Sequence, residues 1–216
     1  MLNSEELCLV YERAYVPEHL PDYVEAVSPA ESHLHGDYIF FTTGTHLIFI
    51  GYPLKVKECR IEESFESVCA SFHPATIAVI APQLWSLDQS YESQSTDTYY
   101  ELTLPVGPLD PELSYMVRRA SRELQVMTGT FGRDHLRLVK DFIANHELAH
   151  GQRQIFERIP RYLKRSKTAR LLEARKAGRL IAFTIVDLGS ANYAFYLFNF
   201  RSLKENIPGA SDLLFY

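Results

Sequence analysis

Residues 179–187 read RLIAFTIVD, a long run of apolar and β-branched side chains between a glycine at 178 and the turn residues LGS. Such a run, bounded by turn residues on both sides, predicts a β-strand. Residues 192–201 follow and read NYAFYLFNFR, with apolar side chains on both faces of an extended chain. A strand that is apolar on both faces is typical of the interior of a sheet. We therefore predict two adjacent antiparallel strands in the middle of a sheet, with 192–201 as a central strand.

The rest of the chain alternates between strand-like and helix-like patterns. Runs rich in β-branched and aromatic residues predict strands at 37–42, 46–50, 75–81, 99–104 and 168–174. Hydrophobic spacing predicts helices at 60–72, 110–124, 133–148 and 151–164, and a further helix that begins at Asp212. Residues 14–36 are rich in Pro, Glu and His and are expected to form a loop that has room for one helical turn. Together these elements predict an α/β fold of the α+β kind, with a mixed, mostly antiparallel sheet flanked by helices.

The composition is that of a folded protein with an acidic balance. The chain has 216 residues, of which 46% are apolar and 23% charged, and its net charge is −5. This charge argues against a general nucleic-acid binder and leaves room only for a local basic patch. Three cysteines without a CxxC pair argue against a disulfide scaffold and a thiolate zinc site. No apolar run is long enough to cross a bilayer and the acidic N-terminus is unlike a signal peptide, so we expect no membrane span and a cytoplasmic location.

The pentapeptide HELAH, which ends at His150, matches the H-E-x-x-H pattern of zinc hydrolases. On the expected helix, His146 and His150 would lie one turn apart and share a zinc ion, with Glu147 as general base. The third ligand is missing, because the extended pattern needs Gly and His where this chain has Arg153 and Phe156. The alternative is an amphipathic helix whose apolar stripe the two histidines extend. We expect no metal here and keep a zinc hydrolase as the weaker alternative.

A basic cluster lies between residues 153 and 170, where seven cations occur in eighteen residues of an acidic protein. Cations at this density suit the phosphates of coenzyme A or of a tRNA acceptor stem. The alternative is a solvated helix face. The candidate phosphate-binding residues are Arg158, Arg161 and Arg165. The full cluster comprises Arg153, Arg158, Arg161, Lys164, Arg165, Lys167 and Arg170.

The segment NIPGAS at 206–211 leads from the predicted strand pair to the helix that begins at Asp212. Two aromatic strands, a loop with Pro and Gly, and a helix start resemble the centre of the GNAT acetyltransferase fold. In that family the loop has the form [Q/R]-x-x-G-x-[G/A], and its backbone N–H groups bind the pyrophosphate of coenzyme A. Pro208 lacks an N–H and Asp212 is negatively charged, so we expect weak or no binding of acetyl-coenzyme A. By this resemblance, the donor-binding candidates are Asn206, Gly209, Ala210 and Ser211.

Over most of the chain the order of elements resembles that of tandem GNAT proteins, such as Fem-type aminoacyltransferases and the catalytic region of lysyl-phosphatidylglycerol synthases. The matching features are the hairpin 37–50, the helix 113–124 with its adjacent arginines, the strand 179–187 and the loop before Asp212. The resemblance implies a first module with a degenerate site at 1–130. It implies a second module at 131–216 that is incomplete after the start of its central helix. Either the chain is then a fragment or a partner chain supplies the rest, and the interpretation also admits a homo-oligomer.

The same resemblance implies acyl or aminoacyl transfer to an amine, with acyl-coenzyme A or aminoacyl-tRNA as donor and no bound cofactor required. Such a transfer uses a base for the amine proton and an acid for the leaving group. Glu173 or Asp187 is the candidate base, and Tyr193 or Tyr196 is the candidate acid. Each of the four also has a structural interpretation, because a buried strand tyrosine usually belongs to the core. The alternative function is a catalytically inactive GNAT-fold module that binds a partner or a small ligand.

Overall fold

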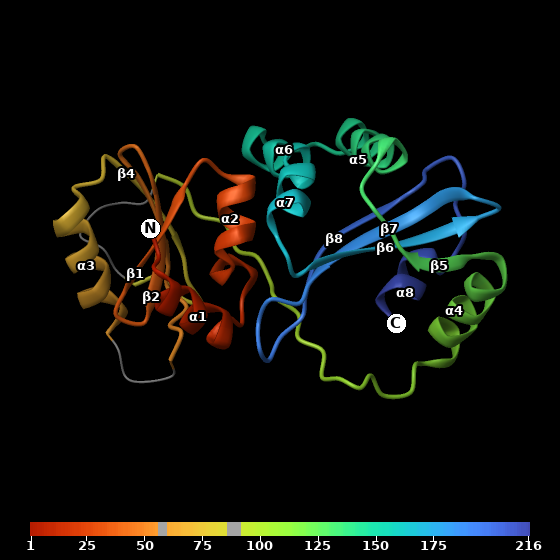
Figure 1. Ribbon diagram of the computed structural model, residues 1–216, viewed down its shortest axis with the longest axis horizontal. Coiled ribbons are helices and arrows are strands. Elements are labelled where there is room, and N and C mark those ends of the chain that lie inside the picture. The colour runs from red at the N-terminus through yellow and green to blue at the C-terminus, as the bar shows by residue number, and fades with distance from the viewer. Residues whose placement is uncertain (56–59, 86–91) are drawn as a thin grey trace.

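A computed structural model of the chain describes residues 1–55, 60–85 and 92–216. Within these residues the chain forms two separate four-stranded sheets, with helices packed against them (Figure 1). One pair of neighbouring strands is parallel and all the other pairs in these two sheets are antiparallel. The expected mixed α/β fold with mostly antiparallel neighbours is therefore confirmed. None of the described helices has the length and apolar character needed to cross a bilayer.

The first sheet has the strand order β1-β2-β3-β4, and β4 runs parallel to β3 because the helix α3 crosses over between them. Asn3 starts the first helix with a capping box, in which Asn3 and Glu6 each accept the backbone N–H of the other. Gly44, with a positive φ of 56°, makes the turn between β2 and β3. The elements are α1 (Ser4–Arg13), the 3₁₀ turn η1 (Pro17–His19), α2 (Pro21–Val27), β1 (Glu31–His35), β2 (Tyr38–Thr43), β3 (His46–Ile50), α3 (Ile61–Phe72) and β4 (Thr76–Ile80).

The strand β2 sends alternate side chains into two apolar cores, as the two-residue period of a strand requires. Tyr38 and Phe40 face α3 and pack in one cluster with Phe65. Ile39 and Phe41 belong to the other cluster, which α1 and α2 cover. The first sheet is thus buried on both faces by aliphatic and aromatic side chains.

The second sheet has the strand order β5-β6-β7-β8, with all neighbours antiparallel. Asp110 caps the N-terminus of the helix that precedes this sheet in the chain, because its carboxylate accepts the N–H groups of Glu112 and Leu113. The elements are α4 (Pro111–Glu123), β5 (Gln125–Thr128), α5 (Arg133–Asn145), α6 (His150–Glu157), α7 (Ile159–Arg165), β6 (Ala169–Lys176), β7 (Arg179–Asp187), β8 (Phe195–Arg201) and α8 (Ala210–Phe215).

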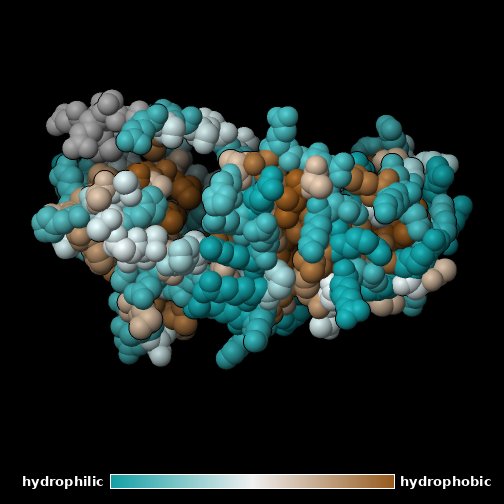
Figure 2. All heavy atoms as spheres, turned by 90° about the horizontal axis from the view of Figure 1, so that it is seen from above, coloured by the Kyte–Doolittle hydropathy of each residue, from teal (hydrophilic) through white to brown (hydrophobic). Residues whose placement is uncertain are grey.

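Helices cover both faces of the second sheet. On one face, α5, α6 and α7 bury a large core in which Phe183 stacks on Phe200 with ring centroids 4.9 Å apart. On the other face, α4 and α8 bury a smaller core around Ala120, Ala182 and Leu214. Seen from the side of α5 to α7, the surface is mostly hydrophilic, with hydrophobic atoms visible between the polar side chains (Figure 2).

The strand pair predicted from residues 179–201 is confirmed, but the central position of its second strand is wrong. Among the described residues, β8 is bonded only to β7 and forms an edge of the sheet. Both faces of β8 are apolar because helices pack against each face, and not because strands flank it on both sides. Phe198 and Phe200 lie in the core under α5 to α7, and Tyr196 contacts Phe215 of α8 on the other face.

Two further expectations from the sequence are wrong. Residues 99–104 do not form a strand, and Tyr99 instead hydrogen bonds to Glu18 through its hydroxyl. Residues 14–36 contain more than a loop with one helical turn, because η1, α2 and β1 lie within them. Two of the three prolines of this segment, Pro17 and Pro21, stand at the first positions of η1 and α2, where a missing N–H costs nothing.

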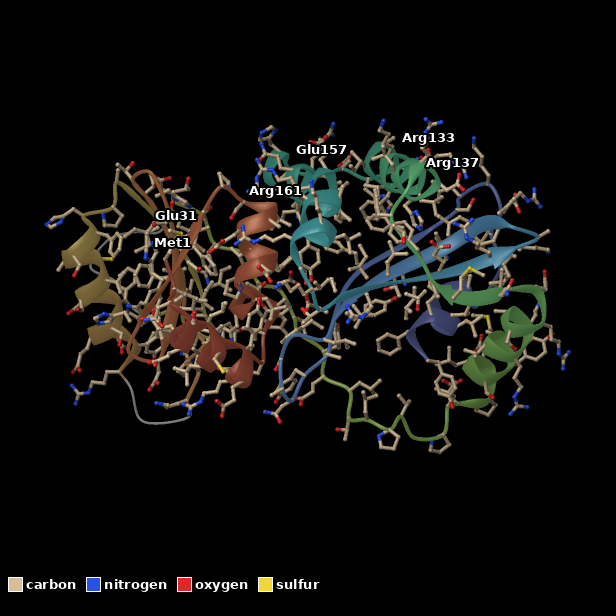
Figure 3. All side chains as sticks on the ribbon, in the orientation of Figure 1. Met1, Glu31, Arg133, Arg137, Glu157 and Arg161 are labelled. Carbon is tan, nitrogen blue, oxygen red and sulfur yellow. The ribbon has the colours of Figure 1, made fainter. Side chains whose placement is uncertain are left out.

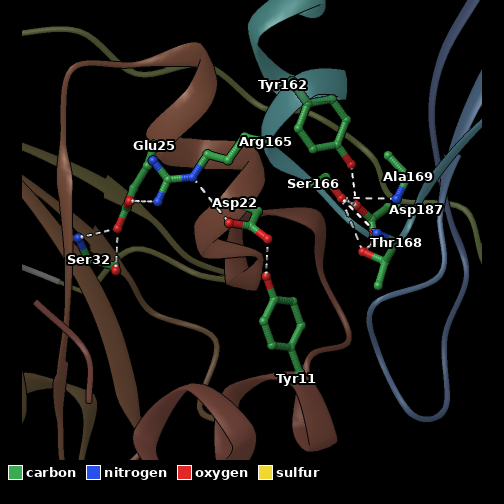
Figure 4. A network of polar contacts seen from close by, with 10 residues as sticks. All are labelled: Tyr11, Asp22, Glu25, Ser32, Tyr162, Arg165, Ser166, Thr168, Ala169 and Asp187. Carbon is green, nitrogen blue, oxygen red and sulfur yellow. Dashed lines mark hydrogen bonds and ion pairs between the residues drawn. The ribbon is translucent and has the colours of Figure 1, made fainter. Parts of the chain in front are cut away.

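The short helix α2 contributes to the cores of both sheets. Val24 belongs to the core of the first sheet, and Ala26 is buried in the main core of the second. Tyr23 packs edge-on against Tyr162 of α7, with ring centroids 5.4 Å apart. Arg165 of α7 forms ion pairs with two carboxylates of α2 (Figure 4). The two sheets are therefore joined through α2 and α7.

Candidate functional site

A surface hollow of about 190 Å³ lies beside the loop between β8 and α8. All four donor-binding candidates predicted from the sequence line it, so the structure brings them together. Met116 of α4 and Arg201 at the end of β8 complete much of the wall. The lining candidates are Asn206, Gly209, Ala210 and Ser211.

Gly209 is required at its position for two independent reasons. Its φ of 82° lies in the left-handed region that favours glycine. A Cβ at this position would also lie 2.5 Å from the carbonyl oxygen of Met116. The glycine of the loop therefore lets α4 approach the start of α8, a packing role that the sequence did not reveal.

The charges around the hollow are mixed. Arg201 contributes a cation to its wall, and Glu205 and Asp212 contribute two carboxylates. Glu205 is partly neutralised by Arg179, whose guanidinium lies 2.8 Å from it. Asp212 lies in the first turn of α8. This balance is less favourable for a phosphate group than a purely cationic or backbone-lined site.

Tyr196 does not line the hollow, but it is the one acid-base candidate that described hydrogen bonds connect to a lining residue. The Asn199 side-chain amide donates to the Tyr196 hydroxyl, and the Ser211 hydroxyl lies 3.2 Å from the other end of that amide. The ring of Tyr196 packs edge-on against Phe215 at 4.9 Å, and 37% of the residue stays exposed. Burial raises the pKa of Tyr196, so the hydroxyl stays protonated at neutral pH and can donate a proton. Asn199 was not predicted from the sequence, although a single amide side chain between two phenylalanines of a strand indicates a polar role.

Glu173 lies on the opposite face of the sheet, in the layer of α5, and is almost fully buried. His135 Nε2 lies 3.0 Å from Glu173 Oε1, and the Arg175 guanidinium binds Oε2. The N–H of Gly132 donates to His135 Nδ1, which places the histidine proton on Nε2, toward the carboxylate. Gly129 packs so closely that a Cβ there would overlap Glu173.

The surroundings of Glu173 limit what it can do. Burial lowers the pKa of His135, although the nearby Glu173 carboxylate partly opposes this shift. The carboxylate is thus held between a neutral imidazole and a guanidinium. It has no access to the hollow on the other face of the sheet, so the structure does not bring it together with Tyr196. His135 was missed from the sequence because nothing marked it apart from the helix periodicity.

Asp187 is buried at the end of β7 and is fully occupied by hydrogen bonds (Figure 4). Thr168 Oγ1 and the Gly189 N–H donate to its Oδ1 at 2.8 and 2.7 Å. Ser166 and the hydroxyl of Tyr162 donate to its Oδ2. Asp187 does not line the hollow, and its carboxylate bonds to Tyr162 of α7 on the opposite face of the sheet. Asp187 is therefore not part of the site.

Tyr193 lies in the loop before β8 and not on the strand. Its ring stacks on Phe195 with centroids 6.4 Å apart, and 39% of the residue is exposed. Tyr193 does not line the hollow, and in the described part of the chain no hydrogen bond joins its side chain to Tyr196 or to Ser211.

Two of the three candidate phosphate-binding arginines bind helix α2 instead. Arg158 donates to the carbonyl of Val27 at 2.7 Å. Arg165 pairs with Asp22, at 3.1 Å, and with Glu25. Arg161 is exposed on the outside of α7, where Figure 3 labels it near Glu157. The basic cluster therefore divides into a structural part that docks α7 onto α2 and an exposed part.

The H-E-x-x-H motif does not lie on a helix as expected. Helix α5 ends at Asn145, His146 has extended dihedral angles, and α6 begins at His150. His146 Nδ1 lies 2.8 Å from the carbonyl oxygen of Phe142, and its ring stacks on that of Phe142. In the described part of the chain, no three ligating side chains gather in a way that would hold a metal ion.

No protein-family model matches the chain, and no curated protein matches its sequence. The functional argument therefore depends on the geometry of the hollow and its neighbours.

Proposed function

We propose that the chain is a GNAT-type acyl- or aminoacyl-transferase that acts on an amine, with its donor bound at the hollow between β8 and α8. One observation carries the proposal. The hollow is lined by the loop that follows the third strand of an antiparallel meander, and this is where the resemblance expects the donor. The same loop is connected through Asn199 to Tyr196.

The proposed chemistry uses Tyr196 as the acid. The amine nitrogen forms a bond to the donor carbonyl carbon, and the bond from that carbon to the leaving oxygen or sulfur breaks. Tyr196 gives its proton to the leaving group, which its raised pKa allows because the hydroxyl is protonated at neutral pH. The amine proton goes to solvent, since Glu173 and Asp187 are both occupied elsewhere.

Aminoacyl-tRNA suits this site better than acyl-coenzyme A. The carboxylates of Glu205 and Asp212 beside the hollow disfavour a pyrophosphate. Exposed cations on α6 and α7, namely Arg153, Arg161 and Lys164, lie on the face of the second sheet opposite the hollow (Figure 1), so only a donor as large as tRNA can contact both.

A catalytically inactive binding module is the second candidate. It is favoured by the same occupation of Glu173 and Asp187, which leaves no free carboxylate near Tyr196. A module of this kind would bind the donor or a partner without turning it over.

The test is a transfer assay with aminoacyl-tRNA and small amines, together with filter binding of tRNA in a salt series and calorimetry with acetyl-coenzyme A. We expect Tyr196→Phe to lower the transfer rate by about 100-fold or more, as the loss of a general acid typically does. Tyr100→Phe is the matched control, because Tyr100 is 93% exposed. Binding of tRNA should weaken steeply with salt, and the Arg161→Ala variant should flatten that slope.

Each outcome separates the candidates. Salt-dependent tRNA binding without transfer would favour the inactive module. Micromolar binding of acetyl-coenzyme A would overturn the argument from Glu205 and Asp212. Absence of both kinds of binding would end the donor proposal.

A further inference from the structure

The carboxylate of Glu18 lies at one end of a chain of three packed tyrosines, where η1, the end of β3 and the segment after residue 92 meet. The Tyr99 hydroxyl donates to Glu18 Oε2 at 2.9 Å. Tyr52 packs edge-on against Tyr99 with ring centroids 5.8 Å apart, and Tyr15 packs edge-on against Tyr52 at 6.1 Å. We call Tyr15, Glu18, Tyr52 and Tyr99 the Glu18 cluster.

The described residues place the Glu18 carboxylate in the cluster without placing a cation beside it. Among the described residues, no lysine or arginine forms an ion pair with Glu18 or contributes to its pKa. Burial raises the pKa of Glu18, and the nearby carboxylate of Asp97 raises it further. A half-buried carboxylate without a counter-charge is unfavourable, so a cation brought to this place is stabilised.

The one histidine in this cluster's surroundings does not supply the missing charge. His19 is fully buried, and burial lowers its pKa to about 4. Its Nε2 donates to the carbonyl of Tyr52 at 2.8 Å, and its ring contacts Tyr15 at 5.0 Å. His19 therefore stays neutral and holds two of the tyrosines in place, which prepares the cluster before any ligand arrives.

We propose that the Glu18 cluster is a binding site for an alkylammonium group, either a free organic amine or a lysine side chain of another protein. Tyrosine faces attract a cation within about 6 Å, and a neighbouring carboxylate supplies the opposite charge. The site is open, because 47% of Tyr99 is exposed. It lies on elements of the first sheet and on the segment after it, so it is separate from the hollow and does not depend on the proposed transfer.

The test titrates the full chain with choline, with Nε-trimethyl-lysine in a short peptide, and with 3,3-dimethylbutan-1-ol, the uncharged analogue of choline. Calorimetry and tyrosine fluorescence report binding. We expect at least one cation to bind in the millimolar range or tighter, and about tenfold more tightly than the uncharged analogue. Tighter binding of choline would indicate a free amine, and tighter binding of the peptide would indicate a protein lysine.

Variants assign the binding to the cluster. Glu18→Gln keeps a hydrogen-bond partner for Tyr99 but removes the charge, and Tyr99→Leu removes an aromatic face. Each should weaken cation binding by about tenfold or more. Glu112→Gln and Tyr100→Leu are the matched controls, because both residues are exposed and lie outside the cluster.

Three results would overturn the proposal. These are no saturable binding of any cation up to about 20 mM, equal binding of the uncharged analogue, or unchanged binding in the Glu18→Gln variant. If Tyr99→Leu fails to fold, the pH dependence decides the question instead. Cation affinity should fall as the pH drops through the raised pKa of Glu18, and this fall should be absent in Glu18→Gln.

Discussion

In both sheets, helices precede three antiparallel strands and one helix follows them. In the first sheet α1 and α2 precede β1 to β3, and in the second α5 to α7 precede β6 to β8. The described strands of the first sheet bury Ser32 as their only polar side chain, whereas those of the second bury Glu173, Thr184 and Asp187. Buried ionisable groups need specific partners. The second sheet thus adds directed polar contacts to its two apolar cores, whereas the first is held mainly by apolar packing.

The sharpest test of this difference is Asp187→Ala. The change removes the acceptor of two or more buried donors, so we expect a loss of about 3–5 kcal/mol in the free energy of unfolding. The matched change in the first sheet is Ser32→Ala, which removes one hydroxyl bond to Glu25 and should cost about 1 kcal/mol. Denaturant unfolding measures both, and equal losses would contradict the distinction between the sheets.

A second comparison uses the glycines Gly209 and Gly44, both of which have positive φ. Gly44→Ala meets open space and should cost about 1–2 kcal/mol from its left-handed backbone alone. Gly209→Ala adds a clash with the backbone of Met116, so we expect about 3 kcal/mol or more. Thermal or denaturant unfolding checks the order. A Gly209→Ala variant as stable as Gly44→Ala would show that α4 moves away easily.

The two buried histidines give a pH-dependent test. Burial lowers the pKa of His19 to about 4 and also lowers that of His135. In the unfolded chain a histidine titrates near 6.5, so between pH 6.5 and 4 the unfolded state binds the proton and the native state does not. Stability should fall as the pH drops through this window, with His19 contributing about 2 kcal/mol between pH 6.5 and 5.

Variants separate these two contributions. His19→Gln should remove more of the pH slope than His135→Gln, because Glu173 partly offsets the lowered pKa of His135. Unfolding free energies measured at several pH values check this, with His150→Gln as the exposed control. A slope that His19→Gln leaves unchanged would refute the assignment.

The smallest expected effect concerns the contact between the sheets. Arg165→Ala breaks the ion pairs with Asp22 and Glu25, but 42% of the arginine side chain is exposed. We expect a loss of about 0.5–1 kcal/mol that shrinks at high salt. Arg153→Ala is the control. A loss insensitive to salt would mean that Arg165 acts through packing instead of charge.

The sequence predicted the strands well where hydrophobic pattern and turn chemistry agreed. The strands near 37–50 and 169–187 and the helix after Asp110 are confirmed. The pattern failed where tertiary contacts override it. Residues 99–104 have strand-like composition, yet the Tyr99 side chain is fixed by Glu18, and the apolar faces of β8 are buried by helices and not by a second strand.

The candidate site was predictable only in part. The loop residues are consecutive, so their gathering around one hollow follows from the chain itself. Glu173 and Tyr196 lie on different strands, and which face each occupies depends on register, including a bulge after Ile185. The partners His135 and Asn199 come from distant or unmarked positions, so no local pattern identified them.

Because α2 packs in the cores of both sheets, its packing during synthesis must occur in two stages. About 140 residues separate α2 from the end of α7, so synthesis leaves the helix without that partner for roughly 7–28 s. During this interval the faces of Tyr23 and Ala26 that later pack against the second sheet remain open to solvent or to a chaperone. The strands of the first sheet can pair during this time. The face of α2 that carries Tyr23 and Ala26 is buried only after α7 has emerged from the ribosome. Slowing translation after residue 27 would lengthen this exposed interval.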